Sequence, residues 1–183
     1  DFYRDLFLMQ QTYSTLFSLT NKLQVKGDKF IGEITTRQYM VLIAISHLPD
    51  EKASLNNISK MLGTTKQNVK QLIKILEAKG FVVTLPSRKD KRTVNIKITE
   101  AAKPVLINCT EKGTEFLSSV FSEFSTQEME TLWGLLKKMY GFDGEEQNGF
   151  EEEPPMEIDS NMAKAQERIL SAFEKTRNEK SNS

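Results

Sequence analysis

The stretch Leu55–Thr99 reads LNNISKMLGTTKQNVKQLIKILEAKGFVVTLPSRKDKRTVNIKIT. A short helix is predicted over 55–62, and Gly63 supplies the left-handed position that often follows a helix. A second, amphipathic helix comes next. The runs 81–85 and 93–98 then have the composition of strands and flank a charged turn. Helix, turn, helix and hairpin in this order are typical of a winged helix-turn-helix that contacts duplex DNA.

The second helix of this stretch has one polar and one apolar face. Thr64 and Gln67 have capping-box spacing, which predicts a start at Thr64, and Gly80 ends the helix. The major groove of DNA admits one α-helix, and amide and ammonium groups can pair with its base edges. The apolar face comprises Val69, Leu72, Ile73 and Leu76. The candidate DNA-contacting residues are Thr64, Thr65, Lys66, Gln67, Asn68, Lys70, Gln71 and Lys74.

The charged turn between the two strands is the second candidate for DNA contact. Its cations can reach a phosphate or a narrow minor groove, which attracts Arg. We expect Asp90 to orient the Arg92 guanidinium through a bidentate pair. The alternative is a solvated turn that makes no contacts. The candidate wing residues are Ser87, Arg88, Lys89, Asp90, Lys91 and Arg92.

Charge is segregated along the chain, although the net charge of all 183 residues is zero. Residues 52–103 contain 12 Lys or Arg and 3 Asp or Glu, a net charge of +9. Residues 141–183 contain 5 Lys or Arg and 11 Asp or Glu, a net charge of −6. A basic block that coincides with a structural motif favours a polyanionic partner over a merely solvated surface.

The motif is flanked by helical segments. Apolar residues recur at intervals of three and four between Phe2 and Leu23, a seam that usually needs a partner surface, and Gly27 and Gly32 bracket the end of this helix. A long helix is expected after the wing, with a bend or a delayed start at Pro104. We therefore predict a mainly α fold with a small antiparallel β-wing and a helical dimerisation region. The expected segments are 1–33 and 99–140 for dimerisation, 34–98 for DNA binding, 141–159 as an acidic linker and 160–183 as a tail helix.

Composition argues against several other classes of protein. No apolar run approaches the roughly 18 residues of a membrane span, and the start DFYRDLFLMQ lacks the pattern of a secretion signal. The single Cys109 among apolar neighbours favours a buried, inert thiol over a redox sensor and is consistent with the cytoplasm. His47, the only histidine, excludes a His-rich metal site, and we expect it at a helix-end surface. No HExxH, CxxC or Walker motif is present, so we expect no enzyme, cofactor or metal.

The chain resembles the MarR family of bacterial transcription regulators. The residues that carry the resemblance are Leu62-Gly63-Thr64, Leu76–Val82, Arg88–Arg92 and Ile98-Thr99-Glu100. The resemblance implies a homodimer that binds a pseudo-palindromic operator, usually as a repressor. It also implies release by a small, frequently aromatic, effector bound between the DNA-binding and dimerisation parts. Tyr39 and Phe116 are the candidates for such a pocket, although aromatic residues at helical spacing are more often core.

Two features depart from the family pattern. The segment Thr99-Glu100-Ala101-Ala102-Lys103-Pro104 stands where the family usually has Thr-Glu-x-Gly, and the acidic end 141–183 extends beyond the usual family end. The tail helix has three interpretations: docking on its own subunit, embracing the other subunit, or competing with DNA for the basic face. An alternative function is a winged helix that docks an acidic protein partner, but the polar turn 64–71 suits base edges better.

Overall fold

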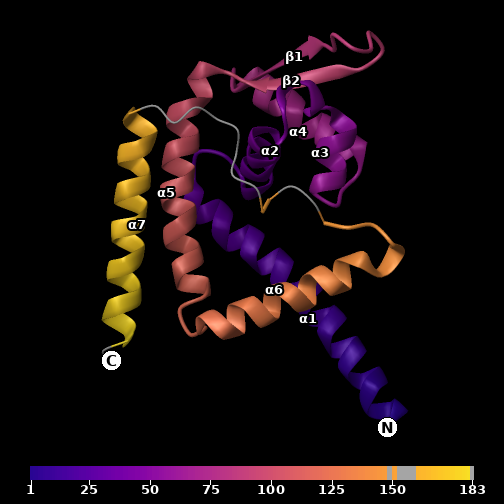
Figure 1. Ribbon diagram of the computed structural model, residues 1–183, viewed down its shortest axis with the longest axis vertical. Coiled ribbons are helices and arrows are strands. Elements are labelled where there is room, and N and C mark those ends of the chain that lie inside the picture. The colour runs from indigo at the N-terminus through magenta and orange to yellow at the C-terminus, as the bar shows by residue number, and fades with distance from the viewer. Residues whose placement is uncertain (148–149, 152–159, 182–183) are drawn as a thin grey trace.

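The computed structural model describes residues 1–147, 150–151 and 160–181. The chain is mostly helical with one two-stranded antiparallel sheet, which confirms the predicted fold class. In Figure 1 the wing lies at one end of the molecule and both termini point toward the other end. Within the described residues, no helix is both long and apolar enough to cross a membrane.

Three helices form the helix-turn-helix lobe: α2 (Thr36–His47), α3 (Leu55–Met61) and α4 (Lys66–Ala78). A capping box of Thr35 and Gln38 begins α2, and the Ser54 hydroxyl accepts from the backbone amide of Asn57 to begin α3. Gly63 has a φ of 61°, as the predicted turn requires.

The prediction that Thr64 caps the next helix is wrong by one residue. The N-cap of α4 is Thr65, whose hydroxyl accepts from the backbone amide of Asn68. The backbone amide of Thr64 instead donates to the carbonyl of Ser59 and closes the turn after α3. The sequence offers two adjacent threonines, and the turn geometry after Gly63 selects the second one.

The wing consists of β1 (Val82–Pro86) and β2 (Val94–Ile98). The strands are antiparallel, with Val82 opposite Ile98 at the base and Pro86 opposite Val94 at the tip. The short 3₁₀ helix η1 (Asp50–Lys52) precedes α3 and contacts β2.

The core of the molecule lies inside this lobe and at its junction with the long helices. The predicted apolar face of α4 is confirmed, because Val69, Ile73 and Leu76 are buried and Leu72 is half-buried. This packing fixes α4 by its inner face and leaves its outer face in solvent. Other core members from neighbouring elements are Val41, Leu42, Ile58, Val82, Ile96, Leu106 and Cys109.

Long helices extend away from the lobe. Helix α1 (Phe2–Ile31) continues through Gly27 and ends at Gly32, which has a φ of 78°. The helix end therefore falls between Gly27 and Gly32, as the sequence suggested, and Gly27 lies buried against α2. Helix α5 (Lys103–Val120) begins only after the 3₁₀ turn η2 (Glu100–Ala102), and Pro104 occupies its first turn. The delayed start is thus confirmed.

Two further helices complete the chain. Helix α6 (Thr126–Tyr140) begins with a capping box of Ser125 and Glu128. The hydrogen bonds that the Glu128 carboxylate accepts from Ser125 hold its pKa below its usual range. The 3₁₀ turn η3 (Gly141–Asp143) follows it, and most of the rest of the expected 141–159 linker lies outside the described residues.

Helix α7 (Ser160–Ser181) runs beside α5 (Figure 1). Arg168 pairs with Glu111 at 2.6 Å, and Arg177 donates to the carbonyl of Phe124 at 3.1 Å. Both partners belong to α5 or to the turn that ends it. Of the three interpretations of the tail helix, the structure shows docking on its own subunit, away from the wing.

Candidate nucleic-acid interface

The outer face of α4 presents polar side chains to solvent. Lys66, Gln67, Lys70, Gln71 and Lys74 are all exposed. Helical spacing places them on one side of α4, opposite the buried Val69, Ile73 and Leu76. A helix fixed by its apolar face and polar on the other can enter a major groove without unfolding.

Three of the expected contact residues stabilise the start of α4. The Asn68 amide donates to the Thr64 hydroxyl at 3.1 Å, and both side chains are half-buried. The exposed Thr65 hydroxyl caps α4. These three side chains therefore shape the N-terminus of α4, where free backbone N–H groups can hold a phosphate.

The wing tip is organised by its own hydrogen bonds. The Ser87 hydroxyl accepts from the backbone amides of Lys89 and Asp90 at 3.2 and 3.4 Å, and Ser87 is only 7% exposed. The expected pair between Asp90 and the Arg92 guanidinium is not what the structure shows. The Asp90 carboxylate accepts from the backbone amide of Arg92 at 2.9 Å. Asp90 thus organises the turn through the main chain and leaves the guanidinium directed elsewhere.

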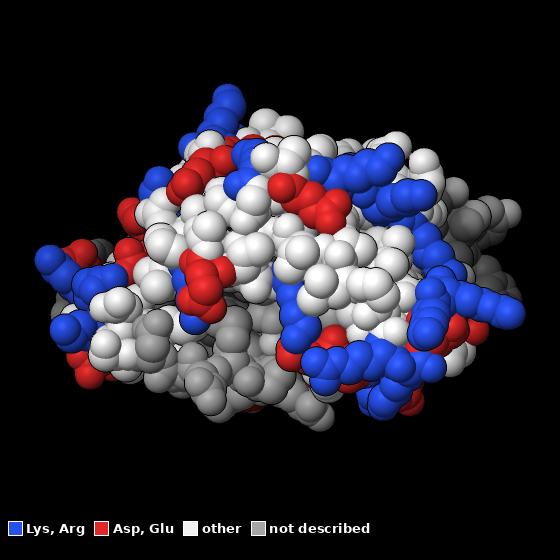
Figure 2. Space-filling model, turned by 90° about the horizontal axis from the view of Figure 1, so that it is seen from above, with Lys and Arg blue, Asp and Glu red and all other residues white. Residues whose placement is uncertain are grey.

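The cations of the wing tip are available to a partner. Arg88, Lys89, Lys91 and Arg92 are exposed, and among the described residues none of them has a carboxylate partner within ion-pair distance. Figure 2 views the molecule from the wing end and shows Lys and Arg side chains gathered along the edge where Figure 1 draws α3 and the wing. Unpaired surface cations gain most from a polyanion, because no internal contact has to be broken.

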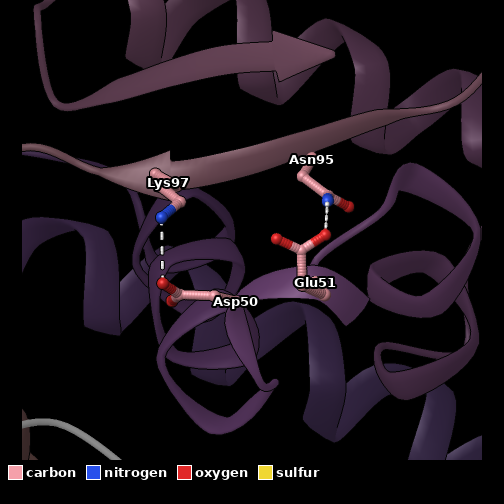
Figure 3. Close-up of polar contacts among 4 residues, drawn as sticks. All are labelled: Asp50, Glu51, Asn95 and Lys97. Carbon is pink, nitrogen blue, oxygen red and sulfur yellow. Dashed lines mark hydrogen bonds and ion pairs between the residues drawn. The ribbon is translucent and has the colours of Figure 1, made fainter. Parts of the chain in front are cut away.

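The wing is attached to η1 by contacts that sequence reasoning missed (Figure 3). Lys97 donates to the Asp50 carboxylate at 2.9 Å, and the Asn95 amide donates to the Glu51 carboxylate at 3.4 Å. The sequence does show two consecutive acidic residues, Asp50 and Glu51, directly before the basic block. Their partners on β2 lie more than 40 residues away in the chain, so the contacts could not be inferred.

Helix α6 contacts the turn of the helix-turn-helix, which was also not foreseen. The Tyr140 hydroxyl donates to the carbonyl of Lys60 at 3.3 Å. Its ring lies so close to Gly63 that a Cβ there would be 3.2 Å from the hydroxyl oxygen. The end of α6 therefore touches the residues that position α4.

The two expected pocket residues do not lie in one cavity. Tyr39 lines a cavity of about 200 Å³ between α2, α5 and α7, where its hydroxyl is 3.0 Å from that of Thr110. Burial raises the pKa of the Tyr39 phenol, an effect that the Thr110 hydrogen bond opposes. Phe116 instead packs against Phe30 with ring centroids 5.8 Å apart. Other residues of the cavity wall are Ile43, His47, Leu106, Ala165 and Ile169.

Cys109 and His47 were the candidates for a redox or metal-binding role, and both pack against neighbouring residues. Cys109 is fully buried, as expected, and burial raises its pKa to about 11. His47 is the last residue of α2, as expected, but it is half-buried rather than fully at the surface, with its ring 5.7 Å from that of Phe150. In the described part of the chain, no group of three His, Cys, Asp or Glu is placed to hold a metal ion.

Comparison with known proteins gives a consistent result. Residues 33–93 match the MarR family. The chain is 27% identical over 139 residues to the HTH-type transcriptional regulator PapX of Escherichia coli, covering 75% of this chain and 82% of that protein. It is 26% identical to MepR of S. aureus in its DNA complex, with a TM-score of 0.64 over 70% of this chain and 96% of MepR. A MarR/EmrR family transcriptional regulator from Acinetobacter sp. ADP1 is also 26% identical, with a TM-score of 0.66 over 73% and 95% of the two chains.

Proposed function

We propose that this chain binds specific duplex DNA as a homodimeric transcription regulator, because residues 33–93 match the MarR family and lie within a winged helix. The observation that carries the proposal is the pairing of a solvent-facing polar side of α4 with unpaired cations at the wing tip. Polar side chains on α4 can pair with base edges, and cations at the wing tip can contact phosphates. MepR, a relative of similar fold, was solved in complex with DNA.

Helix α4 and the wing would make different contacts with DNA. Gln67, Lys70 and Gln71 would contact base edges in the major groove, since their exposed side chains face away from the core. Lys66 and Lys74 flank them and would neutralise phosphates. Arg88, Lys89, Lys91 and Arg92 would contact a flanking phosphate or the minor groove. Thr64, Thr65 and Asn68 would shape the N-terminus of α4, while Ser87 and Asp90 would shape the wing tip.

Dimerisation is supported by apolar side chains that the single chain leaves in solvent. On α1, Phe2 is 91% exposed and Phe17 is 66% exposed, and on α6 Trp133 is 53% exposed. Patches of this kind on long helices are typical of protein interfaces. We propose that residues 1–33 and 99–140 form the dimer and that it places two α4 helices on half-sites about 10 base pairs apart.

We further propose that the protein is a cytoplasmic repressor released by a small aromatic molecule. The Tyr39 cavity supports this, because it lies where α2 of the DNA-binding lobe meets α5. Apolar walls with few polar groups are typical of small-molecule sites. A ligand that moved α2 away from α5 would also move the lobe that contains α4. It would shift the population of the two lobe positions only by as much as it binds one position more tightly than the other.

The test is a selection of duplexes from random DNA by the full chain at ~50 mM salt, where phosphate contacts are strong. The expected result is enrichment of a pseudo-palindrome with half-sites about 10 base pairs apart. Recovery of no enriched duplex would overturn the proposal. The control is a chain with Arg88, Lys89, Lys91 and Arg92 all changed to Ala, which should enrich nothing under the same conditions.

A further inference from the structure

The wing is joined to the rest of the lobe along β2 by the segment between α2 and α3. The backbone amide of Ile96 donates to the carbonyl of Ala53 at 2.8 Å, and Ser54 forms an isolated antiparallel bridge with Asn95. This segment is therefore joined to the edge of the two-stranded sheet by a single bridge. A hairpin of two strands is marginally stable by itself, so this edge contact matters for the wing.

Side chains strengthen the same junction (Figure 3). Asp50 accepts from Lys97 and Glu51 accepts from Asn95, so two consecutive acidic residues of η1 contact alternate residues of β2. Alternate residues lie on one face of a strand. Asn95 is only 6% exposed, and its amide is held between the bridge to Ser54 and the Glu51 carboxylate.

Two carboxylates beside a basic, DNA-facing surface require an explanation. Residues 52–103 have a net charge of +9, and an acidic side chain near phosphates weakens the attraction that such a surface provides. On charge alone, their removal should strengthen DNA binding. Both carboxylates, however, have a partner on β2, so their contacts point to a structural role.

We propose that Asp50 and Glu51 are positioning residues that fix the orientation of the wing and hence the reach of its tip cations. Arg92 lies three residues beyond Asn95, or roughly 10 Å along an extended strand. A small rotation at the η1 junction would therefore displace the tip far more than it displaces α4. The inference rests on the proposed function, because the wing must contact DNA for its orientation to matter.

The experiment compares two double variants that remove the same charges. Asp50→Ala with Glu51→Ala removes both acceptors, whereas Asp50→Asn with Glu51→Gln keeps a carbonyl oxygen at each position. The matched control is Glu77→Ala, which removes one acidic residue from the exposed side of α4. Binding to the selected duplex is measured by titration, and hydroxyl-radical footprinting reports on wing and α4 contacts separately.

We expect the DNA affinity to change in opposite directions in the two double variants. The Ala pair should lose about three- to tenfold in affinity and lose the wing footprint while keeping the α4 footprint, since it removes both side-chain contacts between η1 and β2. The Asn and Gln pair should keep both footprints and bind at least as tightly as the native chain. Both double variants binding more tightly, as Glu77→Ala should, would overturn the proposal.

A further variant keeps the test decisive if the Ala pair does not fold. Exchange of the ion pair in Asp50→Lys with Lys97→Asp preserves both the net charge and the contact. A folded exchange variant should retain the wing footprint, and Asp50→Lys alone should lose it. A folded exchange variant without the wing footprint would contradict the inference. Failure of the native chain to bind any duplex would instead refute the proposed function.

Discussion

Gly27 lies where α1 packs against α2. A Cβ on Gly27 would be 2.7 Å from the hydroxyl oxygen of Thr36, a side chain that is itself enclosed. The backbone amide of Thr36 donates to Asp28 at 2.6 Å, which fixes this part of α2 against α1. The absence of a side chain at Gly27 is therefore what allows the two helices to meet.

We predict that Gly27→Ala destabilises the fold. Overpacking costs typically 1–3 kcal/mol, which exceeds the roughly 0.5–1 kcal/mol that Ala gains over Gly in a helix. Gly113→Ala is the matched control, since the new Cβ would be 3.9 Å from the Tyr39 ring and meets ordinary contact. Urea unfolding should show a loss for Gly27→Ala and a gain for Gly113→Ala. Equal gains would show that α1 and α2 are not so closely packed.

Cys109 should make stability depend on alkaline pH. Its pKa is raised from 9.0 to about 11, mainly by burial and then by the nearby Glu33. Between these values the unfolded chain releases the thiol proton and the folded chain retains it. The free energy of unfolding should therefore fall as the pH rises from 9 to 11, and the thiol should resist alkylation until the protein unfolds. Cys109→Val should show a shallower fall in urea titrations at pH 8 and 10.5, and identical slopes would contradict this account.

At the scale of elements, α4 and the wing should contribute to DNA binding in different ways. Gln67→Ala or Lys70→Ala should cost about 1–3 kcal/mol on the selected duplex and relax the preference at one base position. Arg88→Ala or Lys89→Ala should weaken binding to all duplexes alike and reduce the salt slope by about one. Titrations of selected and scrambled duplexes at several salt concentrations separate the two effects. A wing variant that altered base preference would contradict this division.

The elements themselves could be predicted from the sequence because their signals are local. The capping boxes at Thr35 and Ser125, the left-handed Gly63 and the position of Pro104 all involve residues within one or two turns. The cap at Thr65 was missed by one residue because Thr64 offers the same hydroxyl. The choice depends on the backbone amide of Thr64, which is used to close the turn after α3.

Contacts between elements could not be predicted in this way. The junction of Asp50 with Lys97 and the contact of Tyr140 with Lys60 each join residues far apart in the chain. A single sequence gives no information on such pairs. The role of Asp90 was predicted as an organiser, but through the wrong atoms, because its short side chain meets the backbone amide of Arg92 first.

At the scale of the whole molecule, the tail helix α7 lies beside α5 (Figure 1). It is anchored there through the Arg168 pair with Glu111 and the Arg177 contact with Phe124. Helix α7 also supplies Ala165, which is 3% exposed, to the wall of the Tyr39 cavity. The tail helix thus belongs to the cavity side of the molecule rather than to the wing side.

We predict that a chain ending at residue 147 binds the selected duplex with unchanged affinity at fixed salt. The reason is that α7 contacts α5 and the turn after it. The measurement is a parallel titration of the two chains. Tighter binding by the shortened chain would show that the acidic end competes with DNA.

The central claim is that α4 reads sequence in duplex DNA while the wing supplies affinity. The most direct test measures how many times more tightly the native chain binds the selected duplex than a scrambled duplex of equal length, and repeats this for Gln67→Ala and Arg88→Ala. We predict a ratio of about 10³ or more for the native chain, a lower ratio for Gln67→Ala and an unchanged ratio for Arg88→Ala despite weaker binding. A native ratio near one would contradict the account.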